Sequence, residues 1–164
     1  MRGRCIAPFV LLMTACGAPP PATVEESAQS VALVRQLIDA VWVEYNVDAM
    51  AELLAPDYRY HFNDFSGPGE GLRAAQQGIR RDYQTYSDIR VRIVRLFATD
   101  EWATLQWVWS AIDKTTGRPI EIPTTTVYRI ANGRIAEAWD SYDYTGVALQ
   151  LGYQLMPANQ SRSP

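Results

Sequence analysis

The stretch of residues 89–143 constrains the fold most, because its apolar residues alternate with polar ones and short turns interrupt it. Alternation with a period of two predicts strands that bury one face. Asn132-Gly133 is a typical two-residue hairpin turn, and Asp100-Glu101 is a similarly short link. We therefore expect four consecutive strands that pair mainly antiparallel, the last of which carries Asp140 and Asp143.

Amphipathic helical segments precede these strands. Apolar residues recur at helical spacing on two faces, formed by Val34, Leu37, Ile38, Val41 and Tyr45 and by Leu72, Ala75, Ile79, Tyr83 and Tyr86. Between them, Asn46 can end the first helix in a left-handed conformation, and Asp48 can cap a short helix that reaches Leu54. Residues 58–62 alternate as a short strand. Gly78, inside the last of these helices, indicates close packing there.

Helices followed by a run of strands predict the α+β class. One curved, mostly antiparallel sheet that wraps around the helices would bury the apolar faces of both. The open end of such a sheet would form an apolar pocket. No internal repeat or second domain is visible in the 164 residues.

Composition excludes several classes of function. The chain has 18 acidic and 15 basic residues, so it lacks the basic stripe that a nucleic-acid-binding protein needs. His61 is the only histidine, and the two cysteines are Cys5 and Cys16, near the N-terminus. A zinc site of the usual type cannot be built from this set, and we expect no metal and no cofactor.

Residues 1–15 have the pattern of an export signal. Arg2 and Arg4 precede a short apolar core at residues 6–13, which is far below the roughly 20 apolar residues of a membrane-spanning helix. Ala15-Cys16-Gly17 resembles a bacterial lipoprotein cleavage site, which predicts that Cys16 is lipidated. Ordinary signal cleavage after Ala15 and an uncleaved N-terminus are the two alternatives.

The lipoprotein interpretation divides the chain into four parts. We expect a signal peptide at residues 1–15, a lipidated and proline-rich tether at 16–23, one folded domain at 24–153 and a disordered tail at 154–164. It also predicts a membrane-anchored protein of the bacterial periplasm or cell envelope.

Several short motifs then suggest a family. In this order and spacing they resemble the SnoaL-like polyketide cyclases, or ester cyclases, of the nuclear transport factor 2-like superfamily: Leu54-Ala55-Pro56-Asp57-Tyr58 with His61, Gly67-Pro68-Gly69-Glu70-Gly71, and residues 86–89, 116–119, 128–130 and 133–152. The resemblance covers about residues 28–153. It implies an α+β cone with a deep apolar cavity, commonly dimeric through the outer face of the sheet.

The resemblance also implies an activity, and two residues argue against carrying it over. Family cyclases close a ring by an intramolecular aldol step, in which a cavity aspartate moves a proton. Thr126 occupies the equivalent position, and a threonine cannot act as that base. The loop that carries the family's histidine corresponds to residues 110–115, which contain none. Cyclase activity therefore does not follow from the resemblance alone.

Three residues remain as candidate acids or bases. A histidine side chain can act as an acid or a base near neutral pH, but His61 can equally be a structural residue bonded to the following loop. Asp140 and Asp143 lie three apart on one strand, so they point to opposite faces and at most one enters the cavity. The other can cap the terminal helix or bond a tyrosine. The residues expected to line the pocket are Tyr60, Trp107, Thr126, Tyr128 and Trp139.

Two functions are compatible with these features. The first is a membrane-tethered module that binds a small apolar ligand, polyketide-like or with a carbonyl group, or a protein partner. The replacement of both family catalytic positions and the predicted lipid anchor favour it. The second is an active cyclase, isomerase or hydrolase in which Asp140 or Asp143 works with His61.

Overall fold

The computed structural model describes residues 24–63, 69–99 and 101–156. The predicted signal peptide, Cys16, the tether up to residue 23 and the tail from residue 157 lie outside this part of the chain. No helix within the described part is both long enough and apolar enough to cross a membrane.

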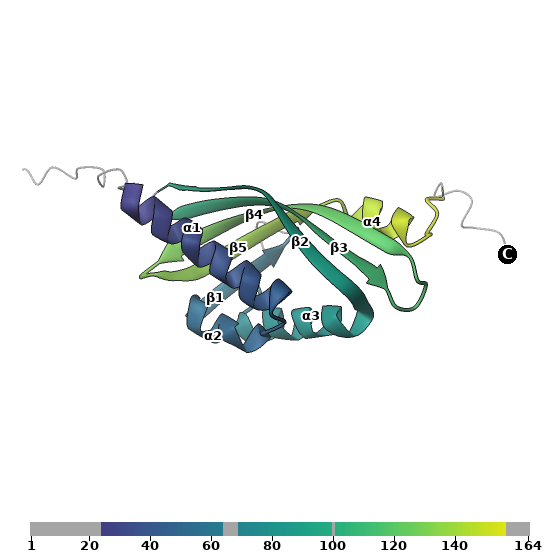
Figure 1. Cartoon of the computed structure of the whole chain (residues 1–164), viewed down its shortest axis with the longest axis horizontal. Helices are drawn as coiled ribbons and strands as arrows, with labels where there is room; N and C mark the ends of the chain where they lie inside the picture. Colours follow the sequence, from purple (N-terminus) through teal and green to yellow (C-terminus); the bar gives the residue numbers. More distant parts are fainter. Residues whose placement is uncertain (1–23, 64–68, 100, 157–164) are drawn as a thin grey trace, which may run out of the picture.

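Most of the helices precede the antiparallel strands, with one helix lying between the first two strands and one following the last. Their bounds are α1 (Val24–Ile38), which continues into a π-helical turn η1 (Asp39–Val43), then η2 (Val47–Ala49), α2 (Met50–Leu53), α3 (Leu72–Thr85) and α4 (Tyr144–Gln150). Figure 1 shows α1, α2 and α3 on one side of the sheet and α4 at the opposite end of the long axis from the start of α1.

Five strands form one sheet. They are β1 (Leu54–Phe62), β2 (Tyr86–Thr99), β3 (Trp102–Asp113), β4 (Pro119–Ala131) and β5 (Arg134–Tyr142), in the order β1-β5-β4-β3-β2. The last four strands form the predicted antiparallel meander, whereas β1 joins it in parallel beside β5. Asn132 and Gly133 both have positive φ, of 52° and 70°, which is the conformation that the predicted two-residue hairpin turn requires.

Three local predictions were wrong. Tyr45, not Asn46, adopts the left-handed conformation, with φ of 56°. Asn46 instead caps η2, because its side chain accepts a hydrogen bond from the Ala49 backbone; Asp48 does not play this role. Gly78 is not a site of close packing, since a Cβ there would meet only the Arg81 guanidinium, at 3.8 Å.

The first strand is also longer than predicted, because it begins at Leu54 and passes through Pro56. Proline cannot donate a hydrogen bond to a neighbouring strand, so it is tolerated mainly at sheet edges and bulges. β1 is an edge strand, and its pairing with β5 shifts register between Leu54 and Arg59, which places Pro56 in the irregular section.

The core lies between the helices and the face of the sheet that they cover, which we call the inner face. Val34 of α1, Leu105 of β3 and Ile135 of β5 are completely buried there. Trp42 of η1 lies over the sheet, with its ring centroid about as far from Trp107 (6.3 Å) as from Trp109 (6.0 Å). The core therefore fixes which face of each strand points inward.

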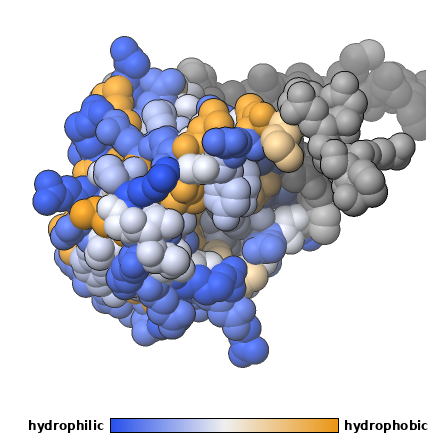
Figure 2. Space-filling view, turned by 90° about the vertical axis from the view of Figure 1, so that its right-hand side faces the viewer, coloured by the Kyte–Doolittle hydropathy of each residue, from blue (hydrophilic) through white to orange (hydrophobic). Residues whose placement is uncertain are grey.

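The opposite side of the sheet, which we call the outer face, is not covered by helices (Figure 1). Phe97 and Trp102 are 56% and 44% exposed on it. The end of the molecule that carries α4 has a mostly hydrophilic surface with scattered apolar residues (Figure 2).

Candidate functional site

Asp140 is the centre of a polar cluster on the inner face. In the β4–β5 pairing Thr126 stands directly opposite Asp140, so the two side chains project to the same side of the sheet. The Thr126 hydroxyl donates to Asp140 Oδ1 at 2.5 Å, and the Tyr60 hydroxyl donates to Asp140 Oδ2 at 2.8 Å. Each carboxyl oxygen is therefore held by one hydroxyl group.

The cluster extends one strand further. Trp107 of β3 donates from Nε1 to the Thr126 hydroxyl oxygen at 3.0 Å. Thr126 is only 2% exposed, so its hydrogen bonds are made within the protein. The cluster thus joins side chains from four strands, namely Asp140 of β5 with one residue each from β1, β3 and β4.

Burial gives Asp140 the properties of a proton-transfer group. It raises the pKa of the Asp140 carboxyl, and the hydrogen bonds from Thr126 and Tyr60 offset part of that rise because they stabilise the charged form. A carboxyl with a raised pKa is a stronger base once it has lost its proton. It can also hold a proton at a higher pH than an exposed aspartate can.

Three tyrosines surround this carboxyl. Burial raises the pKa of Tyr58, Tyr60 and Tyr128, and the negative charge of Asp140 raises all three further. Their phenols therefore stay neutral at physiological pH and remain available as hydrogen-bond donors. A buried acid beside neutral phenols can take a proton from a bound molecule and stabilise the negative charge that forms on it.

The predicted pocket residues divide between the two faces. Tyr60, Trp107, Thr126 and Tyr128 lie on the inner face with Asp140. Trp139 lies on the outer face, because it is the neighbour of Asp140 along β5 and successive strand residues point to opposite sides. Its ring stacks on His61, with centroids 5.2 Å apart and planes 7° from parallel.

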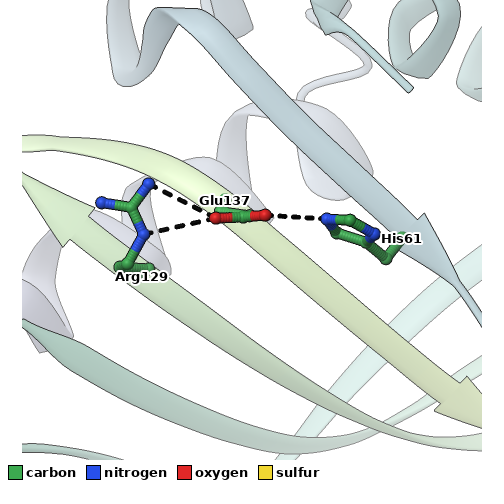
Figure 3. A network of polar contacts seen from close by, with 3 residues as sticks. All are labelled: His61, Arg129 and Glu137. Atoms are coloured by element: carbon green, nitrogen blue, oxygen red, sulfur yellow. Dashed lines mark hydrogen bonds and ion pairs between the residues drawn. The ribbon is translucent and has the colours of Figure 1, made fainter. Parts of the chain in front are cut away.

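His61 also lies on the outer face, since it follows Tyr60 along β1. Its Nε2 contacts Glu137 Oε1 at 2.8 Å, and the other Glu137 oxygen accepts from Arg129 at 3.3 Å. Figure 3 shows Glu137 between the two basic side chains. His61 therefore does not form the predicted acid/base pair with Asp140 or Asp143. The sheet itself separates His61 from Asp140.

Asp143 is separate from this site as well. It lies just beyond the end of β5, is exposed, and caps α4 by accepting a hydrogen bond from the Gly146 backbone at 2.9 Å. Of the three candidate acids and bases, the structure therefore places only Asp140 among the inner-face residues.

Two buried or half-buried titratable residues were missed from the sequence. Tyr58 shares its strand face with Tyr60, and this parity could have identified it. Asp82 of α3 follows Ile79 by three residues and precedes Tyr86 by four, so helical periodicity could have placed it on the packed side. Burial raises the pKa of Asp82 to about 6, and its charge contributes to the raised pKa of Tyr142.

The described residues contain no group of three His, Cys, Asp or Glu side chains that could hold a metal ion. Two surface hollows lie away from Asp140. One is lined mainly by residues of α1 and α2, and the other by residues of β2, β3, β4 and α4.

Comparison with known proteins gives a family match and a fold. The model of the SnoaL-like domain family matches residues 34–138. A candidate polyketide cyclase from Acidithiobacillus ferrooxidans is 26% identical, with a TM-score of 0.64 over 75% of this chain and 94% of that chain. No curated protein sequence matches the chain.

Two further solved structures share the fold. One is a protein with a ketosteroid isomerase-like fold from Catenulispora acidiphila, in complex with trimethylamine; it is 22% identical, with a TM-score of 0.63 over 80% of this chain and 97% of that chain. The other is an epoxide hydrolase from M. tuberculosis, 21% identical, with a TM-score of 0.62 over 77% of this chain and 94% of that chain. The expected nuclear transport factor 2-like architecture is confirmed.

Replacing Asp140 by asparagine should change how the free energy of unfolding depends on pH. As pH rises, the unfolded chain loses the Asp140 proton before the folded protein does, because the folded-state pKa is raised. The parent protein therefore loses up to about 1.4 kcal/mol of stability per pH unit until the folded-state pKa is passed. Asparagine cannot ionise, so urea unfolding should show Asp140→Asn gaining stability relative to the parent as pH rises.

Asp143→Asn is the matched control, because asparagine caps helices as well as aspartate does. Its stability relative to the parent should show no comparable trend. A constant difference between Asp140→Asn and the parent from acid to neutral pH would contradict a raised pKa for Asp140.

Proposed function

The chain belongs to the SnoaL-like domain family, and we propose on this basis that it is an acid/base enzyme in which Asp140 moves a proton on a small apolar carbonyl compound. The observation that carries this proposal is the half-buried Asp140 carboxyl, held on the inner face by Thr126 and Tyr60.

A carboxyl group lies next to the family's catalytic position, although Thr126 at that position has none. The resemblance places the family's aspartate at the position of Thr126, on β4. Asp140 stands directly across from Thr126 on β5, faces the same side and is bonded to it. Neighbouring strands are about 5 Å apart, so the carboxyl is displaced by one strand and still enters the inner side of the cone.

The proposed chemistry is proton abstraction next to a carbonyl group. Ionised Asp140 takes a proton from the carbon beside the carbonyl, and the electrons of the broken C–H bond move towards the carbonyl oxygen. A neutral phenol on the inner face donates a hydrogen bond to that oxygen. The proton then returns to the same carbon, which gives exchange, or to another carbon, which gives isomerisation. In ring closure the enolate carbon instead attacks a second carbonyl group, and the proton passes to the alkoxide oxygen that forms there.

Hydrogen–deuterium exchange tests this proposal without knowledge of the natural substrate. Apolar β-diketones and β-keto esters in deuterated water serve as probes, and NMR follows exchange at the carbon between the two carbonyls. We expect the protein to accelerate exchange and Asp140→Asn to lose that acceleration, on the order of a hundredfold or more. The rate should increase with pH until Asp140 is fully ionised.

Asp143→Asn is again the control, and it should exchange the probes at the parent rate because Asp143 is an exposed helix cap. The proposal fails if the parent protein accelerates no probe, or if Asp140→Asn exchanges them as fast as the parent.

A binding module without turnover is the second candidate function. The observation in its favour is that both oxygens of Asp140 already accept hydrogen bonds from hydroxyl groups, as they would in a purely structural cluster. The exchange experiment separates the two functions. A module without turnover would bind an apolar β-diketone, detected by calorimetry, without accelerating its exchange.

We further propose that the domain works in the cell envelope, tethered through Cys16. The support is the export-like pattern of residues 1–16, which lie outside the described residues. In a bacterial host, the full chain should fractionate with membranes, and Cys16→Ser should release it or leave the signal peptide attached. Cys5→Ser is the control. Equal amounts of parent and Cys16→Ser in the soluble fraction, with the signal peptide removed from both, would exclude the lipid anchor.

We also propose that two copies pair through the outer face of the sheet. Phe97 and Trp102 are exposed there, and contact with a second copy would remove this apolar surface from water. The tether is omitted for this test. Sedimentation of the domain should show a dimer that Trp102→Glu converts to a monomer. Val43→Glu, at a site 60% exposed on η1, should leave the dimer intact. A monomeric parent protein would refute the pairing.

A further inference from the structure

The hydrogen bonds that reach Oδ1 of Asp140 through Thr126 have a fixed direction. The indole N–H of Trp107 can only donate, so Thr126 must accept from it. A threonine hydroxyl carries one hydrogen atom, and that hydrogen points to Asp140 Oδ1 at 2.5 Å. The order of donors is therefore Trp107 to Thr126 to Asp140, and it cannot be reversed without leaving a buried group unpaired.

This order decides which oxygen of Asp140 can carry a proton. A proton on Oδ1 would meet the hydrogen of Thr126, which would then lose the acceptor that it has in this structure. Thr126 is 2% exposed, so water cannot replace the lost partner, and an unpaired buried hydroxyl is unfavourable. Oδ2 is free of this restriction, because its partner Tyr60 is half-buried and its phenol hydrogen can rotate.

We infer that Trp107 and Thr126 are positioning residues that confine proton transfer to Oδ2 of Asp140, and that Tyr60 is the donor released when Oδ2 takes the proton. This inference rests on the proposed function. Thr126 stands at the family's aspartate position. Its role here would be to orient the displaced carboxyl of Asp140.

Before reaction, Tyr60 donates to the ionised Oδ2. The C–H bond of the substrate breaks, its proton bonds to a free lone pair of Oδ2, and its electron pair forms the enolate. Oδ2 is then neutral and a poorer acceptor, so the Tyr60 O–H turns to the new enolate oxygen. Proton uptake and stabilisation of the negative charge thus occur at neighbouring atoms.

The surroundings of Asp140 make this order measurable. The titratable groups that act on Asp140 or are affected by its charge are the phenols of Tyr58, Tyr60, Tyr128 and Tyr142. No basic side chain among the described residues forms an ion pair with it. Loss of a hydroxyl donor should therefore appear directly in the titration of the carboxyl.

The test combines a titration with the exchange assay. The carbon-13 signal of the Asp140 carboxyl reports its pKa in protein labelled at aspartate carboxyls, and it needs no substrate. Thr126→Val should raise the pKa of Asp140 and slow probe exchange on the order of tenfold, with KM unchanged. Thr126→Ser, which keeps the hydroxyl, should restore both values.

Trp107→Phe tests the direction of the hydrogen bonds that run from Trp107 through Thr126 to Asp140. Without the indole N–H, the Thr126 hydroxyl is less firmly oriented and is a weaker donor to Oδ1, so the pKa of Asp140 should rise. In protein that already carries Thr126→Val, the same change should have no further effect on that pKa. Tyr60→Phe should also raise the pKa and should reduce kcat on the order of a hundredfold, because the enolate loses its donor.

The outcomes distinguish this inference from the proposed function. If Thr126→Val leaves the Asp140 titration unchanged, or if the effects of Trp107→Phe and Thr126→Val are additive, the donor order is wrong even when Asp140→Asn abolishes exchange. If the titrations shift as expected but the parent protein exchanges no probe, the donor order stands and the enzymatic function fails.

Discussion

The register between β4 and β5 is the constraint on which the site depends. It places Thr126 directly opposite Asp140, so one hydrogen bond joins the two strands on the inner face. The hairpin at Asn132-Gly133 sets this register, although the pairing also shifts between Arg129 and Ile130. A slip of one residue would move Asp140 to the outer face and bring Trp139 into the core. The same turn chemistry that forms the hairpin thus decides whether the protein has a buried acid.

Much of the fold could be predicted from residue patterns, because periodicity and turn residues act locally. The antiparallel meander followed from alternation, and the family motifs indicated the cone. The position of β1 could not be read in this way. Its parallel pairing with β5 joins residues far apart in the sequence, and Pro56 argues against a strand until the edge position is known.

The site was predictable only in part, for a physical reason. Parity separated Asp140 from Asp143, but it does not say which face is buried; that depends on the helices. Thr126 was assigned by position in the family and looked like a loss of function. Whether a carboxyl stands beside it depends on the cross-strand partner, which a single sequence does not display. His61 illustrates the converse, because a residue with suitable chemistry lies on the wrong side of the sheet.

The acidic side chains on the two faces of the sheet have different kinds of partner. On the outer face, Glu137 lies between Arg129 and His61, and its charge is balanced by a guanidinium. On the inner face, Asp140 has only hydroxyl partners, so burial dominates and its pKa rises. A basic partner would stabilise the folded protein at neutral pH and would remove the raised pKa on which proton transfer relies. Hydroxyl donors hold the carboxyl in place without neutralising it, so Asp140 keeps its basicity at some loss of stability.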